Sequence, residues 1–68
     1  MTRTQKRDLC RELEGVSENE ARERIKNNGL DVRVERRDGE FFPGTMDYRE
    51  DRVNLFIENG KINHAEIG

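Results

Sequence analysis

A polar segment, residues 38–51, separates two stretches of alternating apolar residues, and it constrains the fold more than any other feature. The stretches 30–36 and 52–58 place apolar side chains at every second position, the period of a strand with one buried face. Structureless loops longer than about 12 to 15 residues are normally functional or disordered. The polar segment is therefore the first candidate for a functional site.

The composition of this segment favours an extended, outward-facing loop. Pro43 pushes Phe42 toward an extended conformation, and Gly39 and Gly44 permit turns on either side. A loop that is already rigid loses little entropy when it binds a partner. We also expect Phe41 and Phe42 to anchor the base of the loop.

One helix is clearly predicted before the first strand, from about residue 17 to residue 28. Ser17 followed by Glu20 forms a capping box, and Gly29 is placed to end the helix in a left-handed conformation. The apolar stripe of this helix is narrow, so we expect the helix to lie on a sheet.

The N-terminal segment, residues 1–15, has a weaker pattern. The spacing of Leu9 and Leu13 allows a helical turn or two, with Thr2 or Thr4 as the cap. The glycine at the end of the segment indicates where this structure stops.

A hairpin is predicted near the C-terminus. Asn59 and Gly60 tolerate the positive φ angles of a type I′ turn, so residues 61–67 should pair antiparallel with residues 52–58. We expect an α+β fold, one helix packed on a small mixed sheet. A parallel strand pair is joined by the long loop, and the C-terminal hairpin strand is antiparallel. Strand order and handedness stay open.

The composition bounds the broad class of protein. With 68 residues, 31% hydrophobic and 41% charged, the chain approaches the disordered range, but its apolar residues are clustered and periodic, which favours one folded domain, 1–68. The net charge is −2 with both signs interspersed, so no preference for nucleic acid or membranes follows. The pattern predicts neither a signal peptide nor a membrane span.

Isolated reactive residues do not indicate an enzyme, metal or cofactor. Cys10 has no second cysteine to pair with, and we expect a buried structural side chain, compatible with a reducing compartment such as the cytoplasm. His64 has no second ligand at metal spacing and should lie on the surface. The basic cluster at 33–37 is interleaved with acidic residues, so it does not predict a nucleic-acid site. The carboxylates at 47–51 have no evident catalytic pocket.

The run TMDYREDRVNLF, residues 45–56, closely resembles the potato inhibitor I family of serine protease inhibitors, including its small microbial relatives. GVSENEARERI, residues 15–25, resembles the family more loosely. The resemblance implies substrate-like inhibition by slow turnover, with Met46 in the specificity pocket of the protease and Met46 to Asp47 as the scissile bond. The implied protease-binding loop comprises Gly44, Thr45, Met46, Asp47, Tyr48 and Arg49.

The resemblance also implies support for this loop from the strand that follows it. Two arginines of the family hydrogen-bond to the side chains beside the scissile bond; Arg52 matches the first, and Asn54 stands at the second position. Arg49, or the carboxylate of Gly68 packed against Arg52, could compensate for the missing arginine.

The expected partner is a subtilisin-like or chymotrypsin-like protease, because methionine is flexible and apolar. An alternative stays open: a non-inhibitory protein-binding or self-associating domain of the same fold, using for example the edge of the first strand. We expect a monomer, with a dimer also open.

Overall fold

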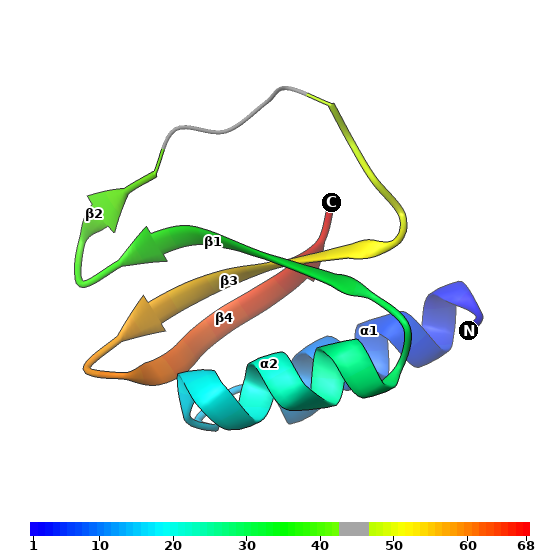
Figure 1. Ribbon diagram of the computed structural model, residues 1–68, viewed down its shortest axis with the longest axis horizontal. Helices are drawn as coiled ribbons and strands as arrows, with labels where there is room; N and C mark the ends of the chain where they lie inside the picture. Colours follow the sequence, from blue (N-terminus) through cyan, green and yellow to red (C-terminus); the bar gives the residue numbers. More distant parts are fainter. Residues whose placement is uncertain (43–46) are drawn as a thin grey trace.

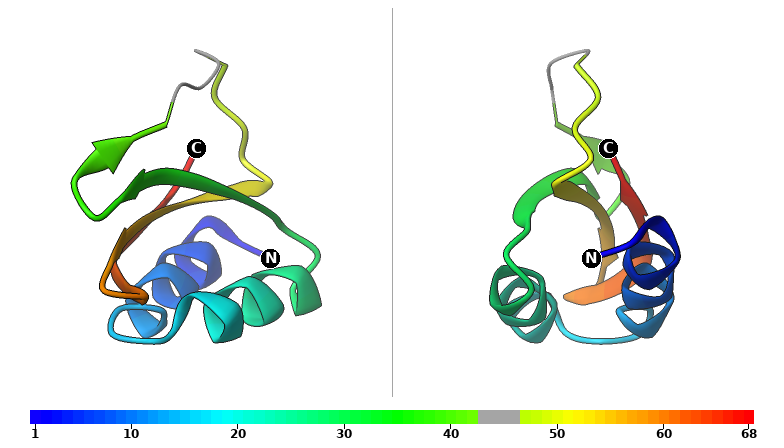
Figure 2. Two further views of the ribbon diagram at one scale, coloured as in Figure 1. Left: turned by 60° about the vertical axis from the view of Figure 1, so that its left-hand side comes forward. Right: turned by 90° about the vertical axis from the view of Figure 1, so that its right-hand side faces the viewer.

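The structure, a computed structural model, describes residues 1–42 and 47–68. Its elements are α1 (Arg3–Glu12), α2 (Glu18–Asn27), β1 (Asp31–Arg37), β2 (Glu40–Phe41), β3 (Arg52–Glu58) and β4 (Lys61–Ile67). The four strands form one sheet in the order β2-β1-β3-β4. Both helices lie on one face of this sheet, and the long loop rises from the other side (Figure 1 and Figure 2).

The α+β fold with a mixed sheet, predicted from the sequence, is confirmed. β1 and β3 pair in parallel at the centre of the sheet, β4 pairs antiparallel with β3, and β2 is a short antiparallel edge strand on β1. The hairpin turn between β3 and β4 also has the predicted geometry, with φ angles of 53° at Asn59 and 75° at Gly60.

The predicted central helix is present as α2. Ser17 is its N-cap, and the Ser17 Oγ accepts a hydrogen bond of 3.3 Å from the Glu20 amide. Gly29 follows the helix with a φ of 75°, as the sequence predicted. The narrow apolar stripe, Ala21 and Ile25, is fully buried against the sheet.

A second helix, α1, replaces the helical turn or two predicted for the N-terminal segment. Thr2 caps it reciprocally with Gln5: the Gln5 amide donates to Thr2 Oγ1 at 3.1 Å, and the Thr2 amide donates to Gln5 Oε1 at 2.8 Å. The helix packs against β4 and buries Leu9 and Cys10. Docking on β4 gives this charged segment the stability that its local pattern does not indicate.

The core lies between the helices and the sheet face that they cover. Its fully buried large side chains are Leu13, Ile25, Val53, Leu55 and Ile57. Neither helix in the described part of the chain is long and apolar enough to cross a membrane.

A bulge in β1 changes which arginines face outward. The register with β3 shifts between Val34 and Arg36, so Arg36 pairs with Phe56 and Arg37 pairs with the buried Ile57. Arg37 accordingly reaches the helix side, where its Nη2 lies 2.7 Å from a carboxylate oxygen of α2. The predicted basic cluster is therefore divided between the two faces of the sheet.

Candidate functional site

The long loop spans the outer face of the sheet because it joins two parallel strands. A parallel connection must return from one end of the sheet to the other, and a helix usually makes that crossover. Here the segment after β2 makes it, and its described end, residues 47–51, lies on the side of the sheet away from the helices (Figure 1). The end of the loop thus lies above the first residues of β3.

Half of the predicted binding-loop residues are described in the structure. Gly44, Thr45 and Met46 lie outside the described residues. Asp47 and Tyr48 are exposed, and 67% of the Tyr48 surface is accessible. Arg49 is partly buried at the base of the loop.

Arg52 is buried beneath the end of the loop, with 7% of its surface exposed. Its Nη2 donates to the main-chain oxygen of Asp47 at 2.9 Å and to that of Gly68 at 2.6 Å. Its Nε donates to the same Gly68 oxygen at 3.2 Å. One guanidinium therefore joins the loop to the end of the last strand through charge-assisted hydrogen bonds.

Gly68 lies directly under the loop. Its amide donates to the Arg52 oxygen at 3.0 Å, and its oxygen accepts from the Arg49 amide at 3.4 Å. A Cβ atom at this position would lie 3.1 Å from Asn54 Nδ2 and 3.6 Å from the Tyr48 ring. The absence of a side chain is what allows the strand end, Asn54 and the loop to approach one another.

Asn54 is buried at the position that the resemblance assigns to a second arginine, with 8% of its surface exposed. Its Oδ1 is buried and has no hydrogen-bond partner among the described residues. An unsatisfied buried acceptor costs about 1 to 3 kcal/mol. Asn54 therefore places a buried amide where the resemblance assigns an arginine.

Arg49 is held by carboxylates at the base of the loop. Its Nε and Nη2 lie 3.0 and 2.8 Å from the two carboxylate oxygens of Asp51, and Nη2 lies 2.6 Å from Asp31 Oδ2. The hydrogen bonds to Asp51, and then to Asp31, raise the pKa of Arg49, and the same contact lowers the pKa of Asp51. Arg49 thus ties the loop to the first residue of β1.

The sequence that forms this fold matches the model of a known family. The model of the potato inhibitor I family matches residues 6–65 of the 68-residue chain. The chain belongs to the potato inhibitor I family. A comparison with curated proteins found no match.

Membership of the potato inhibitor I family gives the broad function. The family consists of protease inhibitors, so the partner class is a protease, and membership indicates a role other than that of an enzyme. The match includes the whole loop together with Arg52 and Asn54, whereas Gly68 lies beyond its end. The hydrogen bonds between Arg52 and Gly68 are therefore a feature of this chain's structure that the family match does not include.

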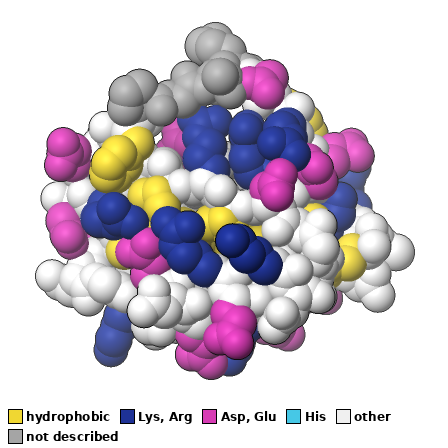
Figure 3. Space-filling model, viewed as in Figure 1, with side chains coloured by type: hydrophobic (Ala, Val, Ile, Leu, Met, Phe, Trp, Pro, Cys, Tyr) yellow, Lys and Arg dark blue, Asp and Glu magenta, His cyan; other side chains and the backbone are white. Residues whose placement is uncertain are grey.

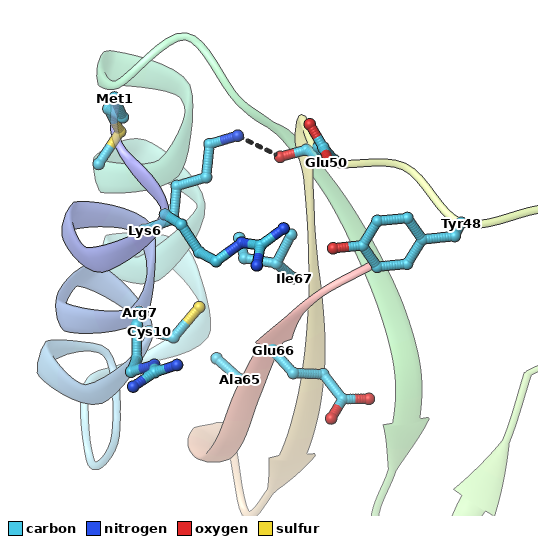
Figure 4. A pocket seen from close by; sticks show the side chains of 10 residues that line it. Met1, Lys6, Arg7, Cys10, Tyr48, Glu50, Ala65, Glu66 and Ile67 are labelled. Carbon is cyan, nitrogen blue, oxygen red and sulfur yellow. Dashed lines mark hydrogen bonds between the residues drawn. The ribbon is translucent and has the colours of Figure 1, made fainter.

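A contact from α1 also reaches the loop of this potato inhibitor I family member. Lys6 Nζ donates to the main-chain oxygen of Glu50 at 2.7 Å. Figure 4 shows Lys6 and Tyr48 on the walls of a cavity of about 370 Å³ between α1 and the end of β4. The sequence did not indicate a role for Lys6, because Lys6 and Glu50 are 44 positions apart and no local pattern relates them.

Phe41 and Phe42 contact arginines and not the core. Phe41 is 66% exposed and Phe42 is 36% exposed. The Arg36 guanidinium lies 5.8 Å from the Phe41 ring centre and 5.8 Å from that of Phe56, and Arg37 lies 5.6 Å from the Phe42 ring centre. Phe41 and Phe42, which were expected to anchor the base of the loop, are therefore exposed side chains that contact arginines.

Cys10 and His64, the two other side chains considered for reactivity, lie outside the loop. Cys10 is buried as predicted, and burial, with a smaller contribution from Glu66, raises the pKa of its thiol. His64 is on the surface, with its ring centre 5.4 Å from that of Phe56. Within residues 1–42 and 47–68, no three His, Cys, Asp or Glu side chains are grouped to hold a metal ion.

Proposed function

We propose that the protein inhibits a serine protease in the substrate-like, slow-turnover manner, with residues 38–51 as its binding loop. Met46 enters the specificity pocket, and the bond from Met46 to Asp47 is offered to the catalytic serine. The observation that supports this proposal most is the buried guanidinium of Arg52, which holds the main-chain oxygen of Asp47 at 2.9 Å. Asp47 would carry the new amine if that bond were cut.

Holding Asp47 favours inhibition over turnover. After cleavage, the amine of Asp47 would stay close to the acyl-enzyme because Arg52 fixes the residue to the body of the domain. A group held in place reacts intramolecularly, so resynthesis of the bond competes with release of the product. Hydrogen bonds to a charged group contribute about 1.5 to 3 kcal/mol, enough to slow the departure of the loop.

Contacts of Arg49 and Glu50, just before Arg52 in the chain, reduce the entropic cost of binding a protease. Arg49 is joined to Asp31 and Asp51, and Lys6 holds the Glu50 oxygen. The chain after the scissile bond is thus ordered before it meets a protease, and less conformational entropy is lost in the complex.

The nature of Met46 selects the class of target. An unbranched apolar side chain suits the pockets of subtilisin-like and chymotrypsin-like proteases. A trypsin-like pocket would leave its buried acid unpaired opposite methionine, which is unfavourable. Tyr48, exposed beside the scissile bond, is available for contacts on the leaving-group side.

The test is a titration of subtilisin and of chymotrypsin with the purified protein, with trypsin as the control. We expect inhibition at one inhibitor per enzyme and, on long incubation, slow cleavage between Met46 and Asp47, seen by mass spectrometry. Rapid cleavage elsewhere, or no inhibition of either enzyme, would contradict the proposal. The latter result would favour a non-inhibitory binding or self-associating domain.

A further inference from the structure

An open hollow of about 280 Å³ lies on the outer face of the sheet beneath the end of the loop. Its polar lining comes from three strands and the loop, and includes Arg33, Glu35, Asp47, Asn54, Glu66 and Gly68. Figure 3 shows Lys and Arg side chains gathered on this face, next to the loop. The hollow is the place where a second supporting arginine would lie if residue 54 were one.

Arg33 is the neighbour of Asn54 across the central parallel pair. The two residues pair in the register of β1 and β3, and Asn54 pairs in turn with Glu66 of β4. Paired residues in adjacent strands project from the same face, and adjacent strands are about 4.8 Å apart. The base of the Arg33 side chain is therefore one strand away from residue 54.

The carboxylates around the hollow favour a cation there. Among its described lining residues, Arg33 is the one cationic side chain, whereas Glu35, Asp47 and Glu66 carry carboxylates. The Arg33 side chain is 20% exposed, and its Nη2 lies 3.4 Å from Glu35 Oε2. In this partly shielded space, loss of the cation would leave like charges facing one another and would push the loop away from the sheet.

We propose that Arg33 is a positioning residue for the binding loop, supplying from β1 the positive charge that holds Asp47 over the sheet in place of the arginine absent at position 54. The inference rests on the proposed function, because the position of Asp47 affects inhibition only if the bond before it is offered to a protease. In this inference the second supporting arginine comes from β1, the strand before the loop. The resemblance instead implies that it comes from β3, the strand after the loop.

The size of Asn54 agrees with this arrangement. Its short side chain is buried, with an Oδ1 that has no hydrogen-bond partner among the described residues, and it leaves the hollow open above it. An arginine at position 54 would extend into the same hollow. Arg33 and an arginine at position 54 are therefore alternative sources of the same positive charge. Either arginine should be sufficient to hold Asp47 over the sheet.

The test compares Arg33→Ala with Arg36→Ala. Both changes remove an arginine of β1 from the outer face, but Arg36 does not line the hollow and contacts Phe41 and Phe56 instead. Two readouts are taken: amide hydrogen exchange at Asp47 and Tyr48 by NMR, and inhibition of subtilisin. For Arg33→Ala we expect about tenfold faster exchange at these amides and about tenfold weaker inhibition, the effect of losing one charge-assisted bond. For Arg36→Ala we expect changes below about twofold.

Relocation of the charge makes the test specific. Adding Asn54→Arg to Arg33→Ala should restore slow exchange and inhibition, which a purely structural role of Arg33 in β1 would not explain. Glu35→Gln removes the ion pair of Arg33 within its own strand and should leave both readouts near those of the wild type.

Three results would overturn the inference: wild-type values for Arg33→Ala, equal losses for Arg33→Ala and Arg36→Ala, or a loss for Glu35→Gln as large as that for Arg33→Ala. A wild type that inhibits no protease would overturn the proposed function, whereas faster exchange at Asp47 in Arg33→Ala would still support the positioning by Arg33. The two failures are thus distinguishable.

Discussion

Arg52 and Gly68 are joined by hydrogen bonds in both directions. The main-chain oxygen of Gly68 accepts from Arg52 Nε and Nη2 at 3.2 and 2.6 Å, and the Gly68 amide donates to the Arg52 oxygen at 3.0 Å. Because Nη2 also donates to the Asp47 oxygen, the start of β3, the end of β4 and the loop meet at one buried side chain. The position of the loop therefore depends on the edge strand as well as on the strand that follows it.

The first prediction concerns the Arg52 side chain. Arg52→Ala leaves the oxygens of Asp47 and Gly68 without their donor, and each unmade bond to a charged group costs about 1.5 to 3 kcal/mol. We expect a folded protein with inhibition of subtilisin about 10- to 100-fold weaker and faster cleavage after Met46. Arg24→Ala, which removes an exposed arginine of α2, is the control. Cleavage resistance equal to that of the wild type would remove Arg52 from the account.

β1, β3, β4 and α2 could be predicted from the sequence because their signals are local, whereas the short strand β2 was not predicted. The alternation in residues 52–58 predicted β3, the turn at Asn59 and Gly60 predicted β4 after it, and Ser17 marked the start of α2. Each of these patterns depends on neighbouring residues alone.

The full length of α1 and the role of Lys6 could not be predicted, since both depend on distant contacts, although the sequence indicated a helical turn or two with Thr2 or Thr4 as the cap. Few apolar residues mark the segment, and its stability comes from packing on β4, the last strand of the chain. The contact of Lys6 with Glu50 exists only after the helix has docked.

The site was predictable in its residues but not in their surroundings. The sequence indicated Arg52, Asn54 and Gly68, whereas Arg33 was interpreted only as part of a basic cluster interleaved with acidic residues. Only the parallel register, which no local pattern determines, puts Arg33 beside Asn54. The bulge after Val34 was likewise not predicted.

The second prediction concerns the glycine beneath the loop. At Gly68, φ is 155°, a conformation that costs other residues about 1 to 3 kcal/mol, and a Cβ atom would lie 3.1 Å from Asn54 Nδ2. We expect Gly68→Ala to lower the free energy of unfolding by about this amount and to weaken inhibition. In Gly15→Ala, the control outside the loop, φ is also positive, at 84°, but a Cβ atom meets nothing within 4 Å. That variant should lose stability, measured by urea denaturation, while retaining inhibition. Equal inhibition by the two variants would contradict a close fit at Gly68.

The third prediction concerns the response of the loop base to acid. Hydrogen bonds from Arg49 lower the pKa of Asp51 below its ordinary value of 3.8 in the folded protein. Folding thus favours the ionised carboxyl, so its stabilising contribution is complete above about pH 4 and is lost as the pH falls through the folded pKa. In Asp51→Asn this contribution is absent at every pH.

The free energies of unfolding of wild type and Asp51→Asn should therefore differ more at pH 7 than at pH 2.5, as measured by urea denaturation. Because Asp51 is exposed, added salt should reduce the difference at pH 7. A difference that is the same at both pH values would show that the contact with Arg49 does not stabilise the fold.

The most direct test of the proposed function exchanges the residue offered to the protease. Met46→Lys places a cation where a trypsin-like pocket has its acid, and Asn19→Lys, the control, adds a lysine at an exposed residue of α2, outside the loop. Inhibition constants are measured for both variants and for the wild type against subtilisin and trypsin. We predict that Met46→Lys loses inhibition of subtilisin and gains inhibition of trypsin, while Asn19→Lys behaves as the wild type. Unchanged selectivity in Met46→Lys would contradict the assignment of Met46 as the residue that enters the protease.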